Sequence, residues 1–495
     1  MQKATLGWPF VLRRLHGRKF RPRSAAGVGY HRKRMHFDDL PARMHLPLAA
    51  LVLASALVLG GGQNTLGDSA VQALALGLVA LCLWRHATDA RAPLPRAAWL
   101  AALVLALPLL QLLPIPHALW LMPEARTELA AELAAVGVDA PSRWTLVPLA
   151  TERALHWMLP AVALFLSALQ MDAAQRNTLL KLLVLAAAAS VVLGLAQLAG
   201  GKDSALRFYA ITNPTEAVGF FANRNHLASL LVVALPLVVV GTARWMGKRE
   251  DTNPRTWLGL VAGLGLVALL ILGIAIARSR AGLLLGMLGL LASLPIVLGL
   301  RRRRGTGRVL AVGVALGLTL AVQFALFGIL QRLEKDALED ARFQYLPVVE
   351  SVAREHWPLG VGLGGFRRAF EAEDPVPLPS YVNHAHNDWA EVWLEAGWPG
   401  WALVGGAVAA LLVSGWQVWR PGRDTSRGQV AIARAAWLGL LLLALHSLAD
   451  YPLRKTAILA VAGVLAGCVA TVPSREKTGL PAPGAGRNVG PAFSP

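Results

Sequence analysis

Histidine, asparagine and carboxylate side chains gather in residues 381–400, between long apolar stretches of the chain. His384 and His386 flank an alanine and are followed by Asn387 and Asp388. Polar groups are costly to desolvate beside a membrane, so such a cluster must be explained. A neutral imidazole can accept a proton from a hydroxyl group. We therefore take His386 as a candidate general base, and His384 and Asn387 as candidate substrate-binding residues.

A short helix is predicted directly after His386. Asp388 and Glu391 have the spacing of a capping box, and Gly397 would end the helix. The free N–H groups at the start of this helix favour an anion close to His386. Asp388, Glu391 and Glu395 would share one helical face, turned away from His386. We thus expect no His–carboxylate pair within this segment, and expect the partners of His386 to come from other loops.

Arginines near the ends of other apolar stretches are candidates for binding an anionic group. The planar guanidinium fork matches phosphate oxygens, and arginines can neutralise a leaving pyrophosphate without a metal. The sequence shows no cysteine and histidine spacing typical of a metal site, so we expect neither a metal nor another cofactor. The arginines in question are Arg207, Arg224, Arg278 and Arg280.

Two further polar segments contain candidate site residues. Asn225 follows Arg224 at the start of an apolar stretch and is a candidate for substrate binding. Asp450 lies in a polar patch at residues 446–455. A carboxylate there could pair with Arg280 or orient His386, and it would stay ionised beside arginines.

The chain that must position these residues has the composition of a helical membrane protein. Of its 495 residues, 55% are hydrophobic and only 16% are charged, against about 25% charged in soluble domains. Apolar runs of about twenty residues are long enough to span a bilayer. We predict an all-α polytopic protein with about twelve spans: 46–61, 69–85, 97–113, 154–170, 178–199, 226–243, 257–277, 281–300, 309–330, 399–419, 431–447 and 456–472.

Charge distribution predicts how these spans are oriented. With both termini cytoplasmic, the inner segments hold 32 Lys and Arg against 8 Asp and Glu, and the outer segments hold 16 against 21. This is the positive-inside pattern. The net charge of +19 therefore reports topology, and we reject nucleic-acid binding as its main explanation.

The orientation divides the chain into three parts. Residues 1–45 form a basic cytoplasmic arm that we expect to be disordered or to meet lipid headgroups. Residues 46–472 form the transmembrane domain, in which 331–398 is a large outer loop that carries the histidine segment. Residues 473–495 are a Pro- and Gly-rich tail, expected to be disordered. Cys82 and Cys468 lie in apolar runs, where packing is their expected role.

Four motifs along the chain resemble, in sequence and in order, those of the O-antigen ligase and polymerase superfamily. The histidine segment reads His386-Asn387, nine residues, then Gly397-x-x-Gly400. The other three motifs are GFFANRNHLA at 219–228, SRAG at 279–282 and GVGLG at 360–364. The resemblance covers roughly residues 150–455, and the layout of spans around a large late outer loop is similar as well.

The resemblance implies a metal-independent glycosyltransferase of the membrane-embedded GT-C type. Its donor would be a glycan on undecaprenyl pyrophosphate, and its acceptor a sugar hydroxyl of lipid A-core or another glycan. His386 would activate the acceptor hydroxyl, and Arg280 would hold the pyrophosphate. Arg224 or Arg207 would be the second arginine. The site would face the periplasm, at the inner membrane of a bacterium.

Related and unrelated functions stay open at this point. A polymerase or a protein O-oligosaccharyltransferase of the same superfamily would share the donor and the leaving group. A lipid-linked glycan flippase would place charged residues near the bilayer midplane, and no Asp, Glu, Lys or Arg stands in the middle of a predicted span. The sequence leaves the sugar composition of the donor and the oligomeric state open.

Overall fold

The computed structural model describes residues 40–62, 65–88, 95–210, 212–246, 254–300, 341–373, 382–422 and 425–472, and four single positions between 301 and 340. The chain divides into residues 1–40 and 41–495, and α1 begins at this boundary. Three predictions lie wholly or largely outside the described residues: the basic arm, the span at 309–330 and the C-terminal tail.

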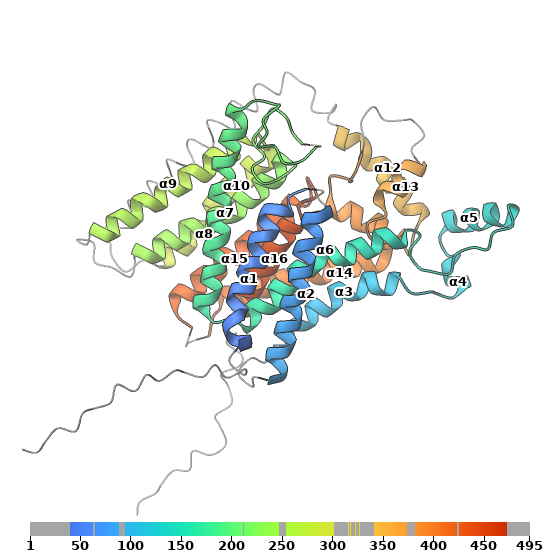
Figure 1. The fold of residues 1–495 in the computed structure, drawn as a ribbon, viewed down its shortest axis with the longest axis horizontal. Coiled ribbons are helices and arrows are strands. Elements are labelled where there is room, and N and C mark those ends of the chain that lie inside the picture. Colours follow the sequence, from blue (N-terminus) through green and yellow to red (C-terminus); the bar gives the residue numbers. More distant parts are fainter. Residues whose placement is uncertain are drawn as a thin grey trace, which may run out of the picture. The chain divides into compact units, whose positions relative to one another are not determined.

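All regular elements of the described residues are helices, as predicted for the fold class (Figure 1). Each of the eleven predicted spans in the described part of the chain coincides with one helix. These helices are α1 (Leu40–Leu59), α2 (Thr65–Thr88), α3 (Trp99–Gln111), α6 (Pro148–Gln170), α7 (Ala173–Ala199), α8 (Arg224–Met246), α9 (Pro254–Ile276), α10 (Arg280–Gly299), α14 (Asp388–Trp419), α15 (Arg427–His446) and α16 (Thr456–Ala470).

Eight of these helices in the described part of the chain are long and apolar enough to cross a membrane: α1, α2, α7, α8, α9, α10, α14 and α15. A bilayer core about 30 Å thick requires about 20 helical residues. The apolar helices α3 and α16 are shorter than this. Multiple apolar helices of this kind indicate a multi-pass membrane protein.

Helix α8 lies at the centre of the bundle. Almost all of its apolar stretch is buried, and it packs against α9, α10 and α15 (Figure 1). Helix α16 packs mainly against α6, where an added Cβ at Gly463 would lie 2.3 Å from the Ala161 carbonyl oxygen. Small residues let helix backbones approach closely in this way.

Shorter helices lie in the connections between the long ones. They are α4 (His117–Trp120), α5 (Glu124–Ala135), α12 (Ala341–Glu355), α13 (Phe366–Glu373) and the 3₁₀ turns at Arg96–Ala98 and Pro452–Arg454. Helices α12 and α13 lie within the segment at 331–398 that was predicted as a large outer loop. Val352, Phe366 and Phe370 form a small apolar core with Leu394 of α14, so α12 and α13 are packed onto the beginning of α14.

The loop between α3 and α6 holds the glycine-rich turn at 360–365. The buried Arg126 guanidinium donates to the carbonyl oxygens of Trp144, at 2.7 Å, and Gly360, at 2.8 Å. The Trp144 indole N–H donates to the Leu359 carbonyl oxygen at 3.0 Å. These bonds fix the glycine-rich turn against α14, whose residues Leu394 and Glu395 accept from Val361 and Gly362.

Candidate functional site

The histidine loop at 382–387 ends in a helix cap. Asn387 is the N-cap of α14, and its side-chain oxygen accepts from the N–H groups of Trp389 at 3.0 Å and Ala390 at 3.2 Å. The predicted capping box of Asp388 and Glu391 is therefore wrong, because the cap lies one residue earlier and both carboxylates bind elsewhere. His386 has a positive φ of 53°, a conformation rare for residues other than glycine. Such local strain clusters at functional sites.

The His386 ring faces the loop between α15 and α16. Its Nδ1 atom lies 3.3 Å from the Asp450 Oδ1 atom. The Asp450 side chain is buried, while 21% of the His386 side chain is exposed. An ionised carboxylate only accepts hydrogen bonds, so Nδ1 donates and Nε2 keeps a free lone pair. The pair can therefore take up a proton at Nε2, with Asp450 stabilising the resulting imidazolium.

Tyr451 is a central contact for three segments of the chain. The His384 ring stacks on it with centroids 4.1 Å apart, and His386 and His226 each meet it edge-on at 4.9 Å. Its phenol is hydrogen-bonded by Asn223 and Asn383, while burial and the nearby Asp450 charge raise its pKa. The tyrosine thus stays neutral and joins the segments around residues 223–226, 383–386 and 450–451.

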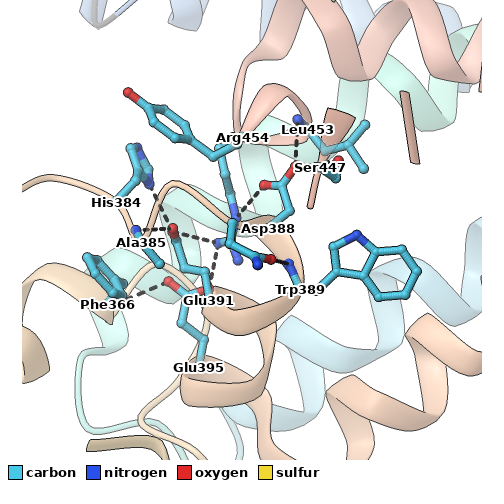
Figure 2. Close-up of polar contacts among 12 residues, drawn as sticks. Phe366, His384, Ala385, Asp388, Trp389, Glu391, Glu395, Ser447, Leu453 and Arg454 are labelled. Atoms are coloured by element: carbon cyan, nitrogen blue, oxygen red, sulfur yellow. Dashed lines mark hydrogen bonds and ion pairs between the residues drawn. The ribbon is translucent and has the colours of Figure 1, made fainter. Parts of the chain in front are cut away.

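A buried guanidinium ties the histidine loop to the α15–α16 loop (Figure 2). Arg454 lies 3.6 Å from Asp388, 3.5 Å from Glu391 and 2.5 Å from Glu395. Burial opposes the charge of Arg454, but these three carboxylates outweigh it and raise the pKa of the guanidinium. We call Arg454 and its three carboxylates the Arg454 clamp. The carboxylates share one face of α14, and that face is covered by Arg454.

Glu391 also binds the histidine loop. Its Oε1 atom lies 2.8 Å from the His384 Nδ1 atom, and its Oε2 atom accepts from the Ala385 N–H at 3.0 Å (Figure 2). Burial lowers the pKa of His384 despite the opposing effect of Glu391. The expectation that this segment holds no His–carboxylate pair is therefore wrong. That expectation concerned the His386 ring alone. The loop folds back over the first turn of α14, and this brings His384 to Glu391.

Two of the candidate arginines bind groups in their own loop. Arg207 donates to the carbonyl oxygens of Asn213 at 2.7 Å and Glu216 at 3.0 Å. Arg224 pairs with the Glu216 carboxylate. In the structure these two arginines thus contact groups of their own loop, and Asp450 is the charged group that His386 contacts. Asn225 is buried in the first turn of α8, where its N–H donates to Asn223 at 2.8 Å.

Arg280 opens α10 with an exposed side chain, after an N-cap at Ser279 that accepts from the Gly282 N–H at 3.1 Å. An added Cβ at Gly282 would lie 2.6 Å from the Ala228 Cβ, so α10 and α8 begin side by side. One turn into α8, the Ser229 hydroxyl lies 2.9 Å from the His446 Nδ1 atom at the end of α15. The helices that begin at Arg224 and Arg280 thus start at the bundle end that holds Asp450.

Sequence reasoning missed Tyr451, Arg454 and Glu391 as members of this cluster. The polar patch at 446–455 was the available signal, because Asp450, Tyr451 and Arg454 lie within it. Among the described residues, no group of three His, Cys, Asp or Glu side chains could hold a metal ion. The arrangement brings the imidazole of His386 within 3.3 Å of the buried Asp450 carboxylate, at the bundle end where the helices that begin with Arg224 and Arg280 start.

Comparison with known proteins identifies part of the chain. Residues 265–405 match a family model described as O-antigen ligase. This segment includes Arg280, the glycine-rich turn and the histidine loop. A search of curated proteins found no match. Residues 265–405 are therefore similar to the O-antigen ligase family, whose members are glycosyltransferase-like enzymes.

Proposed function

We propose that the protein is an O-antigen ligase that transfers a glycan from undecaprenyl pyrophosphate to a sugar hydroxyl of lipid A-core. The reaction takes place at the periplasmic face of the bacterial inner membrane. The family match to residues 265–405 supports the reaction class. The choice of donor and acceptor rests on the motif resemblance.

The observation that carries the proposal is the contact between His386 and the buried Asp450 carboxylate at 3.3 Å. With Nδ1 donating to Asp450, the Nε2 atom accepts the proton of the acceptor hydroxyl. The acceptor oxygen then bonds to the anomeric carbon of the donor glycan. The bond from that carbon to the pyrophosphate oxygen breaks, and the pyrophosphate leaves with the electron pair. A single displacement of this kind inverts the anomeric configuration.

Positive charge must offset the charge that grows on the pyrophosphate. Arg280 and Arg224 supply it, with Arg207 and Asn225 binding the substrate nearby. Bidentate guanidinium contacts suit phosphate oxygens, so the mechanism uses arginine and no metal or other cofactor. Arg224 exchanges its pairing with Glu216 for the pyrophosphate when the donor binds. His384 and Asn387, in the same loop as His386, are the further substrate-binding residues of this proposal.

The direct test is transfer by the purified protein from lipid-linked glycan to lipid A-core in vitro. We expect the wild-type protein to form product and His386→Ala to lose at least about 100-fold in rate, the contribution typical of general bases. His117→Ala, in an exposed part of α4, is the matched control and should keep full activity. Full transfer by His386→Ala would contradict the role of the base.

A knockout strain separates this reaction from its relatives. Loss of all long-chain lipopolysaccharide with an intact core supports the ligase, and a band with one repeat unit supports a polymerase. Altered glycoprotein with unchanged lipopolysaccharide points to a protein acceptor. Accumulation of lipid-linked glycan at the cytoplasmic face would point to a flippase.

A further inference from the structure

The Arg454 clamp, which is Arg454 with its three carboxylates, lies between two loops. One loop carries the proposed base, His386, and the other carries its carboxylate partner, Asp450. Asp450 and Tyr451 precede Arg454 in the α15–α16 loop, and the histidine loop precedes the carboxylates of α14. The side chains of Asp388, Glu391 and Glu395 are almost completely buried, as is that of Arg454. A buried ion cluster of this kind adds little net stability but is costly to break. The cluster therefore acts mainly by fixing the relative positions of the two loops that it joins.

One side of the clamp holds the α15–α16 loop. The Asp388 Oδ2 atom accepts from the Ser447 hydroxyl at 2.7 Å and from the Leu453 N–H at 3.2 Å (Figure 2). The Asp388 N–H donates to the Ser447 carbonyl oxygen at 2.9 Å. These bonds surround Asp450 in sequence, so they set its position relative to the first turn of α14.

The other side of the clamp holds the histidine loop. Glu391 accepts from Ala385 and His384, the two residues directly before His386. Glu395 accepts from the N–H of Phe366 at 3.2 Å, which adds the start of α13 to the same unit (Figure 2). His386, whose φ is positive, therefore lies between two anchored parts of the chain. Glu391 binds the two residues before it, and Asn387, directly after it, caps α14.

We propose that Arg454 and Glu391 are positioning residues that set the register between His386 and Asp450. This inference rests on the proposed function, in which His386 is the base. The guanidinium holds Glu391, and Glu391 holds the His384 ring and the Ala385 N–H. These contacts position the backbone before His386 and so aim its ring at Asp450. Loosening either link moves the base while leaving the arginines at the starts of α8 and α10 in place.

The test uses Glu391→Gln in the full-length protein. Glutamine keeps the side-chain volume but offers one acceptor oxygen and no charge, so it cannot hold His384, Ala385 and Arg454 together. We expect kcat for glycan transfer to fall by about 100-fold, the effect of a misplacement of about 1 Å, with KM for the lipid-linked donor unchanged. Arg454→Lys, which keeps the charge without the planar fork, should lower kcat in the same way.

Matched controls come from an exposed pair on α12. Glu350 and Arg354 form an ion pair at 2.6 Å in which both side chains are largely exposed. Glu350→Gln and Arg354→Lys make the same chemical changes outside the clamp, and both should keep wild-type kcat. Wild-type kcat in Glu391→Gln would overturn the proposal while leaving the role of His386 intact.

A second measurement does not depend on activity. Diethyl pyrocarbonate modifies neutral imidazole, and mass spectrometry can compare the rates of modification of His386 and the exposed His117. In Glu391→Gln we expect the His386 rate to change several-fold and the His117 rate to stay constant. An unchanged His386 rate would overturn the positioning role. A rise at buried histidines throughout the chain would also overturn it, because it would show general unfolding. If the wild-type protein transfers no glycan, the proposed function fails and the modification rates still decide the geometry.

Discussion

The pairing of His386 with Asp450 leads to a prediction for a single residue. Asp450→Asn replaces the carboxylate by a group that can also present an N–H to Nδ1, which disfavours the tautomer with a free Nε2 lone pair. We expect the transfer rate to fall by on the order of 100-fold with little change in protein yield. Initial rates with lipid-linked glycan measure this. Asp203→Asn, on an exposed loop, is the control, and equal rates for both variants would contradict an orienting role for Asp450.

The sequence alone could indicate His386 and Asp450 as candidate site residues. It could not indicate the contacts made by the residues around them. Titratable residues in an otherwise apolar chain stand out by type alone. The burial of Glu391 and its bond to His384 could not be predicted, because they depend on Arg454, which lies 63 positions later in the chain. Helical periodicity places the three carboxylates on one face, and only the tertiary fold decides what covers that face.

Helix α14 depends on a glycine at its kink. Gly397 has φ of 51° and ψ of −134°, and an added Cβ would lie 2.1 Å from the Pro358 carbonyl oxygen. Gly397→Ala should therefore destabilise the protein by at least about 1–3 kcal/mol through backbone strain alone. Thermal unfolding in detergent measures the loss. Gly405→Ala lies on the same helix, where an added Cβ meets no atom within 4 Å, and it should be neutral or slightly stabilising. Equal midpoints for the two variants would contradict the strained kink.

The segment after α12 contains a buried histidine that should make stability depend on pH. Burial, with a smaller effect from Arg126, lowers the pKa of His356 to about 4. The unfolded chain binds this proton near pH 6.5, so stability is present above pH 6.5 and is lost as the pH falls towards 4. Between pH 7 and 5 the loss from His356 is about 2 kcal/mol. His356→Gln should show a smaller drop in unfolding midpoint over this range than the wild-type protein, and an equal drop would contradict the prediction.

Whole-molecule architecture was the most predictable level. Bilayer thickness fixes the length of apolar runs, so the described helices fall where the predicted spans were placed. The packing order could not be predicted, because lipid-facing and protein-facing residues are both apolar in a membrane protein. Helices α8 and α9 are both apolar enough to cross a membrane, yet 94% of the apolar window of α8 is buried against 39% of that of α9.

The orientation of the whole molecule follows from the charge count and can be tested by labelling. The natural cysteines, Cys82 and Cys468, are buried, so new cysteines at exposed positions should dominate the signal. We expect Val138→Cys, on the side predicted to be periplasmic, to react with a membrane-impermeant maleimide in intact spheroplasts. Arg427→Cys, at the start of α15, should react only after permeabilisation, because basic residues are retained on the cytoplasmic side. The reverse pattern would place His386 in the cytoplasm and contradict a periplasmic reaction.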